Sequence, residues 1–388
     1  MQVETLNSLF KAHRNQALYG RHIHTEIISP LLKQLPEKFK VEVIGKSVLD
    51  EDIYSVTIGT GPNKVLMWSQ MHGNESTTTK ALFDLFNVLK EKSSISNRIL
   101  SQCTLKVIPI LNPDGAKAYT RLNSNGIDLN RDAKNLSQFE SKALRSIFDN
   151  FKPSFCYNLH GQRTIFGAGN NNSPSTVSFL APAQDIECTI TPNRKKAMEV
   201  IVIMNNMLQQ QIPHQVGIYD DAFNDNCVGD TFQSNNVPTI LFEAGHYKDD
   251  YDREHTRTFI FNSLIVSLLH IAENIVDGKG FKAYENIPKN EKNFYDIIIR
   301  NAKVDIDGIH IDNDIAIQYQ EVLESNTIRL IPRVEKIDSD LSMFYGHREI
   351  DANYQLLESI NKNKISVGYE NDFVKVNNER LSLKLSKT

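Results

Sequence analysis

The chain has 388 residues, more than a typical single domain, so its length predicts one large domain and a smaller one. Hydrophobic residues make up 40% of it and charged residues 23%, a composition that excludes a disordered, collagen-like or coiled-coil protein. With 43 basic and 47 acidic side chains, the net charge is -4, so we expect no nucleic-acid partner.

No stretch approaches the roughly 20 apolar residues of a membrane-spanning helix, so we expect no membrane insertion. The N-terminus lacks the apolar core and small-residue cleavage site of a signal peptide, and a cytoplasmic location is the expectation. The cysteines are too widely spaced for a disulfide framework or a CxxC zinc site. We interpret them as buried thiols: Cys103, Cys156, Cys188 and Cys227.

From residue 41 to about 276, short strand-like runs alternate with helical periodicities. The predicted strands are rich in β-branched and aromatic residues. They cover residues 41–48, 53–59, 64–71, 104–110, 154–159 and 238–243. Apolar side chains at helical spacing predict helices around 82–89, 144–151, 197–208 and 260–275. The pattern predicts an α/β fold with a mixed, mostly parallel central sheet flanked by helices.

A change in sequence character near residue 280 predicts a domain boundary. We expect a first domain over 1–280, which includes an N-terminal helical segment, and a small all-β domain over 281–388. The loop 167–177 is dense in Gly, Asn, Ser and Pro and has no period, so we expect it on the surface.

The first chemically informative segment follows the predicted strand 64–71 and contains His72 and Glu75. One turn of chain can present an imidazole and a carboxylate at this spacing to the same point, as in many zinc sites. The spacing alone is not specific, because His270 and Glu273 repeat it inside a predicted helix, where a solvated face is the simpler interpretation.

Further motifs give His72 and Glu75 a context. His160 and Glu243 each lie at the end of a predicted strand, and His72 follows another strand. Functional side chains of α/β sheets gather beyond the carboxyl ends of the strands, so these three are expected to meet in one crevice. The motifs that follow HxxE along the chain are LNPDG (111–115), RLNSNGIDLNRD (121–132), NLHG (158–161) and ILFEAGH (240–246).

On this ordered set of motifs, the chain resembles the M14 family of zinc carboxypeptidases over roughly residues 41–276. The resemblance implies a zinc carboxypeptidase-like fold and one Zn2+ per chain, held by His72, Glu75 and His160. It also implies that the Asp128 carboxylate holds a ligand imidazole, a role that fixes the tautomer. The alternative for Asp128 is an ordinary turn residue in NGID.

The resemblance implies two catalytic side chains. Glu243 matches the glutamate that takes a proton from the attacking water and passes it to the leaving amine. It lies at the end of an apolar strand and is partly shielded from solvent, which favours a raised pKa. The alternative is a solvated residue at the strand end. Arg121 matches the arginine that stabilises the oxyanion of the tetrahedral intermediate.

Substrate binding is implied for three more residues. Asn130 and Arg131 match the pair that grips the terminal carboxylate, and the alternative is a loop pair bonded to backbone. Asp132 departs from the family pattern, and its charge either weakens that grip or pairs with Arg131. Tyr219 is a candidate for the mobile tyrosine that closes over substrate, and a packed surface tyrosine is the alternative.

The predicted function is that of a zinc-dependent metallocarboxypeptidase that hydrolyses the C-terminal peptide or amide bond of a peptide with a free terminal carboxylate. A second hypothesis is a zinc deacylase of N-acyl amino acids, because HGNE and DLNR also resemble motifs of aspartoacylase and succinylglutamate desuccinylase. A third is an inactive, peptidase-like binding protein. The sequence leaves open the side-chain specificity, the oligomeric state and the task of the C-terminal module.

Overall fold

The computed structural model describes residues 1–306, 308–361 and 364–385. The chain divides into two compact units, the first formed by Met1–Gln162 and Ser175–Asn290 and the second by Arg163–Pro174 and Glu291–Thr388. The boundary expected near residue 280 therefore falls at residue 290 in this division. In addition, the segment 163–174 groups with the second unit, which its aperiodic sequence does not indicate.

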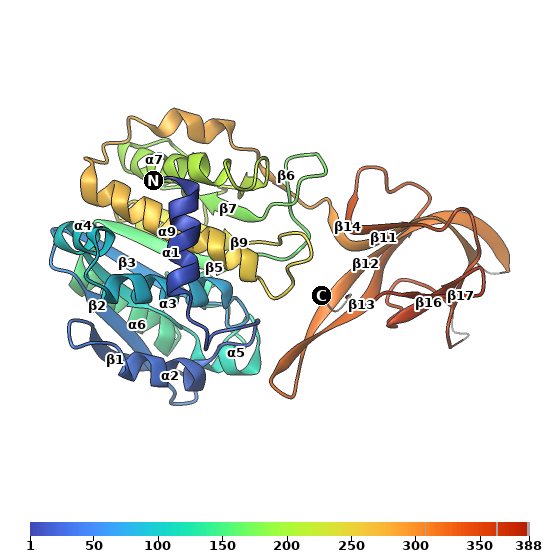
Figure 1. Ribbon diagram of the computed structural model, residues 1–388, viewed down its shortest axis with the longest axis horizontal. Coiled ribbons are helices and arrows are strands. Elements are labelled where there is room, and N and C mark those ends of the chain that lie inside the picture. The colour runs from blue at the N-terminus through green and yellow to red at the C-terminus, as the bar shows by residue number, and fades with distance from the viewer. Residues whose placement is uncertain (307, 362–363, 386–388) are drawn as a thin grey trace. The chain divides into compact units, whose positions relative to one another are not determined.

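Within the described residues, the first unit contains a central eight-stranded sheet (Figure 1). Strand β3 is parallel to β4 on one side and to β5 on the other, β5 is parallel to β9, and β7 is parallel to β8. The pairs β1/β2, β2/β4 and β7/β9 are antiparallel, which confirms the predicted mixed sheet. In spatial order the strands are β1 (Lys40–Lys46), β2 (Asp52–Ile58), β4 (Cys103–Ile108), β3 (Asn63–Ser69), β5 (Phe155–Gly161), β9 (Thr239–Ala244), β7 (Val177–Leu180) and β8 (Val216–Ile218).

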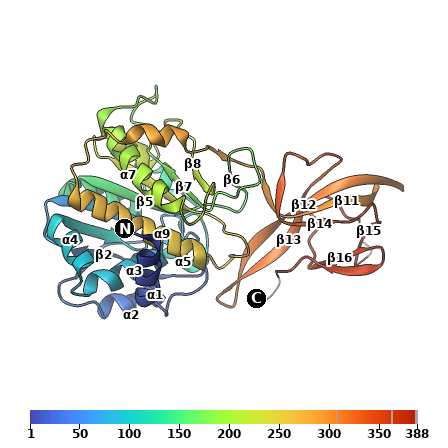
Figure 2. The ribbon, with the colours of Figure 1, turned by 45° about the horizontal axis from the view of Figure 1, so that its top comes forward.

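Helices cover both faces of this sheet, because the central strands are apolar on both sides. In β3, the side chains of Val65 and Met67 enter one core cluster, and those of Leu66 and Trp68 enter the other. The first face carries α3 (Thr77–Lys90), α7 (Pro192–Leu208) and α9 (Glu254–Glu273), with α9 between the other two (Figure 2). The second face carries α6 (Phe139–Phe151) and α8 (Val228–Ser234).

The other helices of the first unit are shorter or lie nearer the N-terminus. Helix α1 packs against α3 and α9, and α2 contacts α5. These helices are α1 (Val3–His13), α2 (Thr25–Lys33), α4 (Ser94–Gln102) and α5 (Pro113–Ala118), together with the 3-10 turns η1 (Leu129–Arg131) and η2 (Phe281–Asn286). None of the described helices has the length and apolarity needed to cross a membrane.

Two sequence expectations on burial need correction. Of the four cysteines, Cys103 and Cys156 are buried as expected, but Cys188 and Cys227 are only partly buried. The loop 167–177 was expected on the surface, but only its middle is open: Ala168 is fully buried in the short strand β6 (Gly167–Ala168), and Ser175 and Thr176 are buried as well. Strand β7 begins at Val177 and joins the central sheet. Strands β7 and β8 were not predicted because runs of three or four residues carry too little periodicity.

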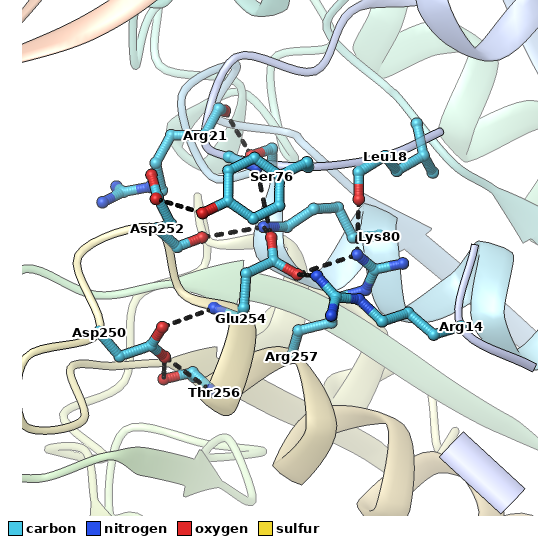
Figure 3. Close-up of polar contacts among 12 residues, drawn as sticks. Arg14, Leu18, Arg21, Ser76, Lys80, Asp250, Asp252, Glu254, Thr256 and Arg257 are labelled. Carbon is cyan, nitrogen blue, oxygen red and sulfur yellow. Dashed lines mark hydrogen bonds and ion pairs between the residues drawn. The ribbon is translucent and has the colours of Figure 1, made fainter. Parts of the chain in front are cut away.

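A buried ionic network ties the N-terminal segment to α3 and α9. Asp84 of α3 and Arg257 of α9 are fully buried and form two bonds of 2.6 Å, from Arg257 Nε and Nη2 to the two carboxylate oxygens. Arg257 also donates to the Leu18 carbonyl at 2.6 Å, and Arg14 donates to Glu254 at 2.7 Å (Figure 3). The segment between α1 and α2 is therefore held by charge-assisted hydrogen bonds.

The second unit is built from β-strands, which confirms the predicted all-β C-terminal module. Buried isoleucines such as Ile297, Ile299, Ile315 and Ile317 form part of its apolar core. Among the residues described, one sheet has the order β13 (Thr327–Asp338), β12 (Ile309–Glu324), β11 (Phe294–Ile306) and β14 (Tyr345–Asp351). A second has the order β15 (Leu357–Ser359), β16 (Phe373–Val376) and β17 (Glu379–Ser382); strand β10 (Asn290–Glu291) lies at the division between the units.

Candidate metal centre

The predicted site residues lie at one edge of the central sheet. Strands β3, β5 and β9 are mutually parallel, so their carboxyl ends meet at the same edge. His160 of β5 and Glu243 of β9 are paired in register, and the loop after β3 carries His72 and Glu75. The three segments, distant in sequence, are thereby brought together.

The side chains of His72, Glu75 and His160 converge on one point. His72 Nδ1 lies 2.9 Å from one carboxylate oxygen of Glu75, and His160 Nδ1 lies 2.9 Å from the other. The two Nδ1 atoms are 3.1 Å apart. No other described residues form a comparable group of three potential ligands, and in this group the ligand atoms all lie within 4.8 Å of one another.

This arrangement fits a tetrahedral zinc ion. Zinc–nitrogen bonds of about 2.0 to 2.1 Å place two tetrahedral ligand nitrogens about 3.3 Å apart, close to the observed separation of the two Nδ1 atoms. Both imidazoles are almost fully buried, and two ring nitrogens beside one carboxylate are a ligand set that zinc prefers. The residues present therefore suit one zinc ion with an open fourth position.

Asp128 organises the surroundings of His72. One of its carboxylate oxygens accepts hydrogen bonds from His72 Nε2 at 3.0 Å and from the Asn130 amide at 2.9 Å, and the other accepts from Arg121 Nε and Nη2. A proton on Nε2 leaves the Nδ1 lone pair for a metal. Burial alone would raise the pKa of Asp128, but His72 and Arg121 outweigh it and hold that pKa well below its usual range.

The loop 70–76 that carries His72 and Glu75 is supported by residues whose roles the sequence analysis missed. Asn112, from the NPDG motif, donates its side-chain amide to the Met71 carbonyl at 3.2 Å and its backbone amide to the Gln70 carbonyl at 3.0 Å. Gln70 donates its side-chain amide to the Gly73 carbonyl at 2.7 Å. The signals in the sequence were the NPDG motif and a polar Gln70 between the apolar strand and HxxE.

Gly73 packs so closely against α5 that we expect Gly73→Ala to displace the metal loop. A Cβ atom at residue 73 would lie 1.9 Å from the carbonyl carbon of Gly115 and 2.2 Å from the amide of Ala116, so backbone must move. We expect the free energy of unfolding to fall by about 1 to 3 kcal/mol and zinc retention after dialysis to decrease, as measured by urea titration and elemental analysis.

A matched control for that substitution is Gly161→Ala beside the same site. There the nearest atom to the added Cβ lies 3.4 Å away, at the Cβ of Glu75, which is an ordinary contact. We expect this variant to keep its zinc. Zinc content and stability that are equally unchanged in Gly73→Ala would contradict the close packing of the loop.

Glu243 lies in β9 beside the proposed ligands and has a protonation state set by its surroundings. Its Oε2 atom is buried and accepts no hydrogen bond from the described residues. Burial and the charge of Glu75 raise the pKa of Glu243 well above its usual value, and Arg121 and Arg253 offset only part of that rise. A divalent cation beside Glu75 would oppose this shift.

Arg253 is a further supporting residue that the sequence analysis missed. It is almost fully buried and has a left-handed backbone with φ of 60°. Its terminal nitrogens donate to the carbonyls of Ala244 and Gln162 at 3.0 and 3.1 Å. Because Ala244 directly follows Glu243 and Gln162 lies two residues after His160, Arg253 joins the two strand ends that carry the site.

Asn130 and Arg131 follow Asp128 in the turn η1. Asn130 Oδ1 accepts a hydrogen bond from the Val228 amide at 3.0 Å, which leaves its side-chain NH2 group to donate. The exposed Arg131 donates from Nη1 to the Asn130 carbonyl and to Cys227 Sγ. The Asn130 amide is bonded to Asp128, which in turn is bonded to His72, and the predicted carboxylate grip stays a prediction.

The Asp132 carboxylate takes neither of the roles weighed for it. One of its oxygens accepts hydrogen bonds from the amide and hydroxyl of Ser137 at 2.9 and 2.7 Å, and the other accepts from the Gln138 amide at 2.9 Å. Asp132 is buried and serves the loop before α6. The Asp132 carboxylate is therefore taken up by Ser137 and Gln138 rather than by the Arg131 guanidinium.

Tyr219 follows β8, and its backbone amide donates to the Phe179 carbonyl at 3.0 Å. The side chain is half-buried. Burial first, and then the charges of Glu243 and Glu75, raise the pKa of the Tyr219 phenol well above its usual value. The predicted closure of Tyr219 over substrate stays a prediction.

Comparisons with known proteins agree with this geometry. The sequence model of the family described as zinc carboxypeptidase matches residues 25–219, half of the chain. A probable carboxypeptidase 2 of Arthroderma benhamiae is 26% identical over 114 residues, which are 29% of this chain and 21% of that protein. The catalytic chain of rat carboxypeptidase N is 25% identical over 147 residues, 31% of this chain and 32% of that protein. The match thus spans about a fifth of the first of these relatives.

Solved structures share the fold at lower sequence identity. A putative carboxypeptidase A from Shewanella denitrificans has a TM-score of 0.54 and 17% identity, covering 63% of this chain and 68% of that one. Carboxypeptidase A from Helicoverpa armigera has a TM-score of 0.53 and 16% identity, covering 70% and 80%. These likenesses establish a carboxypeptidase-like fold.

Proposed function

The chain belongs to the zinc carboxypeptidase family, and we propose that it is a zinc-dependent carboxypeptidase that releases the last residue of peptides with a free terminal carboxylate. The observation that carries the proposal is the convergence of His72, Glu75 and His160 next to Glu243 at one sheet edge. All the proposed site residues lie in the first unit, so we assign catalysis to it.

The proposed ligands are His72 Nδ1, the Glu75 carboxylate and His160 Nδ1, which would hold one Zn2+. When bound there, the ion polarises a scissile carbonyl and increases the acidity of water. Asp128 keeps the His72 ring in the required orientation through its bond to Nε2. The Gly161 amide donates to Glu75 at 3.0 Å and holds that carboxylate in place.

Glu243 and Arg121 are the proposed catalytic residues. Glu243 accepts a proton from the attacking water at its carboxylate and returns it to the leaving amine. The Arg121 side chain is fixed by two bonds to Asp128, and its Nη1 atom lies 3.6 Å from Glu75. A guanidinium placed in this way stabilises negative charge that develops on the substrate carbonyl oxygen.

Asn130, Arg131 and Tyr219 are the proposed substrate-binding residues. The Asn130 amide and the Arg131 guanidinium donate to the two oxygens of the terminal carboxylate, a planar match that lysine does not offer. Tyr219 covers the bound substrate. With this grip, only the last peptide bond reaches Glu243, which makes the enzyme an exopeptidase.

A pair of peptides tests the proposal. The first has a free C-terminus, and the second has the same sequence with a C-terminal amide. We expect release of the last residue from the free peptide only, loss of activity after dialysis against a chelator, and recovery when zinc is added. Mass spectrometry of the products measures each result.

The same assay separates the alternatives. N-acetyl aspartate and N-succinyl glutamate serve as substrates for the deacylase hypothesis, and cleavage of these alone would replace the proposal. Equal cleavage of the free and amidated peptides would contradict the carboxylate grip. Tight peptide binding without turnover in the zinc-loaded protein would favour a binding protein.

A further inference from the structure

Gln70 begins the metal loop in a backbone conformation that its residue type rarely adopts. It follows β3 directly, two residues before His72, and its φ is 45°. This is the left-handed region, in which the Cβ atom of an L-residue approaches its own backbone and which glycine enters without that strain. A glutamine at this position therefore needs a contribution from its side chain.

That side chain is buried, and both protons of its amide are used. Gln70 is 1% exposed. Its Nε2 atom donates to the Gly73 carbonyl at 2.7 Å and to the Ile23 carbonyl at 2.9 Å. The first bond joins Gln70 to Gly73, the residue that follows His72, so this amide fixes Gly73 relative to the end of β3.

The second bond leads to a segment that is held by further hydrogen bonds. Ile23 lies in the N-terminal segment, where Ser76 Oγ donates to the Arg21 carbonyl and Arg257 donates to the Leu18 carbonyl (Figure 3). Ser76 directly follows Glu75 at the start of α3. The metal loop is thus attached to the N-terminal segment at both of its ends, by Gln70 at one end and by Ser76 at the other.

We infer that Gln70 is a positioning residue for the metal site: its strained backbone is kept because its amide fixes the loop that presents His72 and Glu75. This inference rests on the proposed zinc site. A glycine at position 70 would relieve the backbone strain and remove the two hydrogen bonds at the same time. Its effect on zinc binding therefore separates a role in positioning the ligands from a role in folding alone.

The test is Gln70→Gly, with zinc affinity measured by competition with a chromophoric chelator and melting measured by circular dichroism of the zinc-free protein. We expect the apparent melting temperature of the zinc-free variant to fall, since relief of the backbone strain offsets only part of the cost of the two lost buried hydrogen bonds. We expect zinc affinity to fall by about tenfold to a hundredfold, the usual effect of losing a group that orients metal ligands.

Two further variants keep the result interpretable. Gln70→Asn tolerates the left-handed backbone but is shorter by one methylene, so it should lose zinc affinity to a similar extent and replaces the glycine variant if that one does not fold. Lys152→Gly is the matched control. Lys152 is exposed and has a left-handed backbone with φ of 51°, so glycine relieves backbone strain there and should leave zinc affinity unchanged.

Unchanged zinc affinity in a folded Gln70 variant would overturn the inference, whatever happens to the melting temperature. Failure of the wild type itself to bind zinc would instead overturn the proposed function, so the two failures are distinguishable.

Discussion

Glu243→Gln should reduce turnover of a peptide substrate by about a hundredfold to ten-thousandfold and leave zinc bound. The amide has nearly the same shape as the carboxylate but does not accept the proton of the attacking water. Glu243 is in register with His160 and is not among the three converging ligand groups, so the metal site should persist. Steady-state kinetics and elemental analysis of dialysed protein measure the two effects separately.

His72→Ala provides the contrasting pattern for that experiment. It removes a proposed ligand, so zinc should be lost and activity should fall with it. A Glu243→Gln protein with the parent rate would exclude Glu243 as the general base. Loss of zinc in the same variant would show that Glu243 belongs to the metal-binding set instead.

The candidate site was predictable from the sequence for those side chains that lie at the ends of strands. His160 and Glu243 end apolar, β-branched strands, and the carboxyl ends of parallel strands meet at one sheet edge. The structure places these two residues together and brings His72 and Glu75 to them. The long helices and the strands β1 to β5 were predictable for a similar reason, since their apolar periodicity extends over several residues.

Other features depend on contacts between distant segments and leave little trace in the local sequence. Arg253 supports the site from a loop by bonds to carbonyl groups, which any residue could supply. The Gln70 backbone angle is set by acceptors at Gly73 and Ile23. Asp132 shows the same limit, because its partners are amides several residues away rather than the arginine beside it.

Asp84→Ala should destabilise the first unit by about 3 to 5 kcal/mol of unfolding free energy. Asp84 and Arg257 are both fully buried, and the substitution removes the two-bond partner of the guanidinium, which then keeps Glu254, at 3.0 Å, as its remaining anionic partner among the described residues. It also removes the acceptor of the Asn15 amide, at 2.7 Å. Trp68, the single tryptophan, is buried in this unit, so its fluorescence during urea titration reports the change.

An exposed ion pair and a double substitution test whether burial of the charge causes the large loss of stability in Asp84→Ala. Asp149→Ala breaks the Arg145–Asp149 pair on the surface of α6, with a bond of 2.9 Å, and should cost at most about 1 kcal/mol. Replacing both buried partners, as in Asp84→Leu with Arg257→Met, should recover much of the stability that Asp84→Ala loses, because no uncompensated charge remains. Equal losses for Asp84→Ala and Asp149→Ala would contradict this explanation, since the two substitutions remove the same carboxylate and differ in its burial.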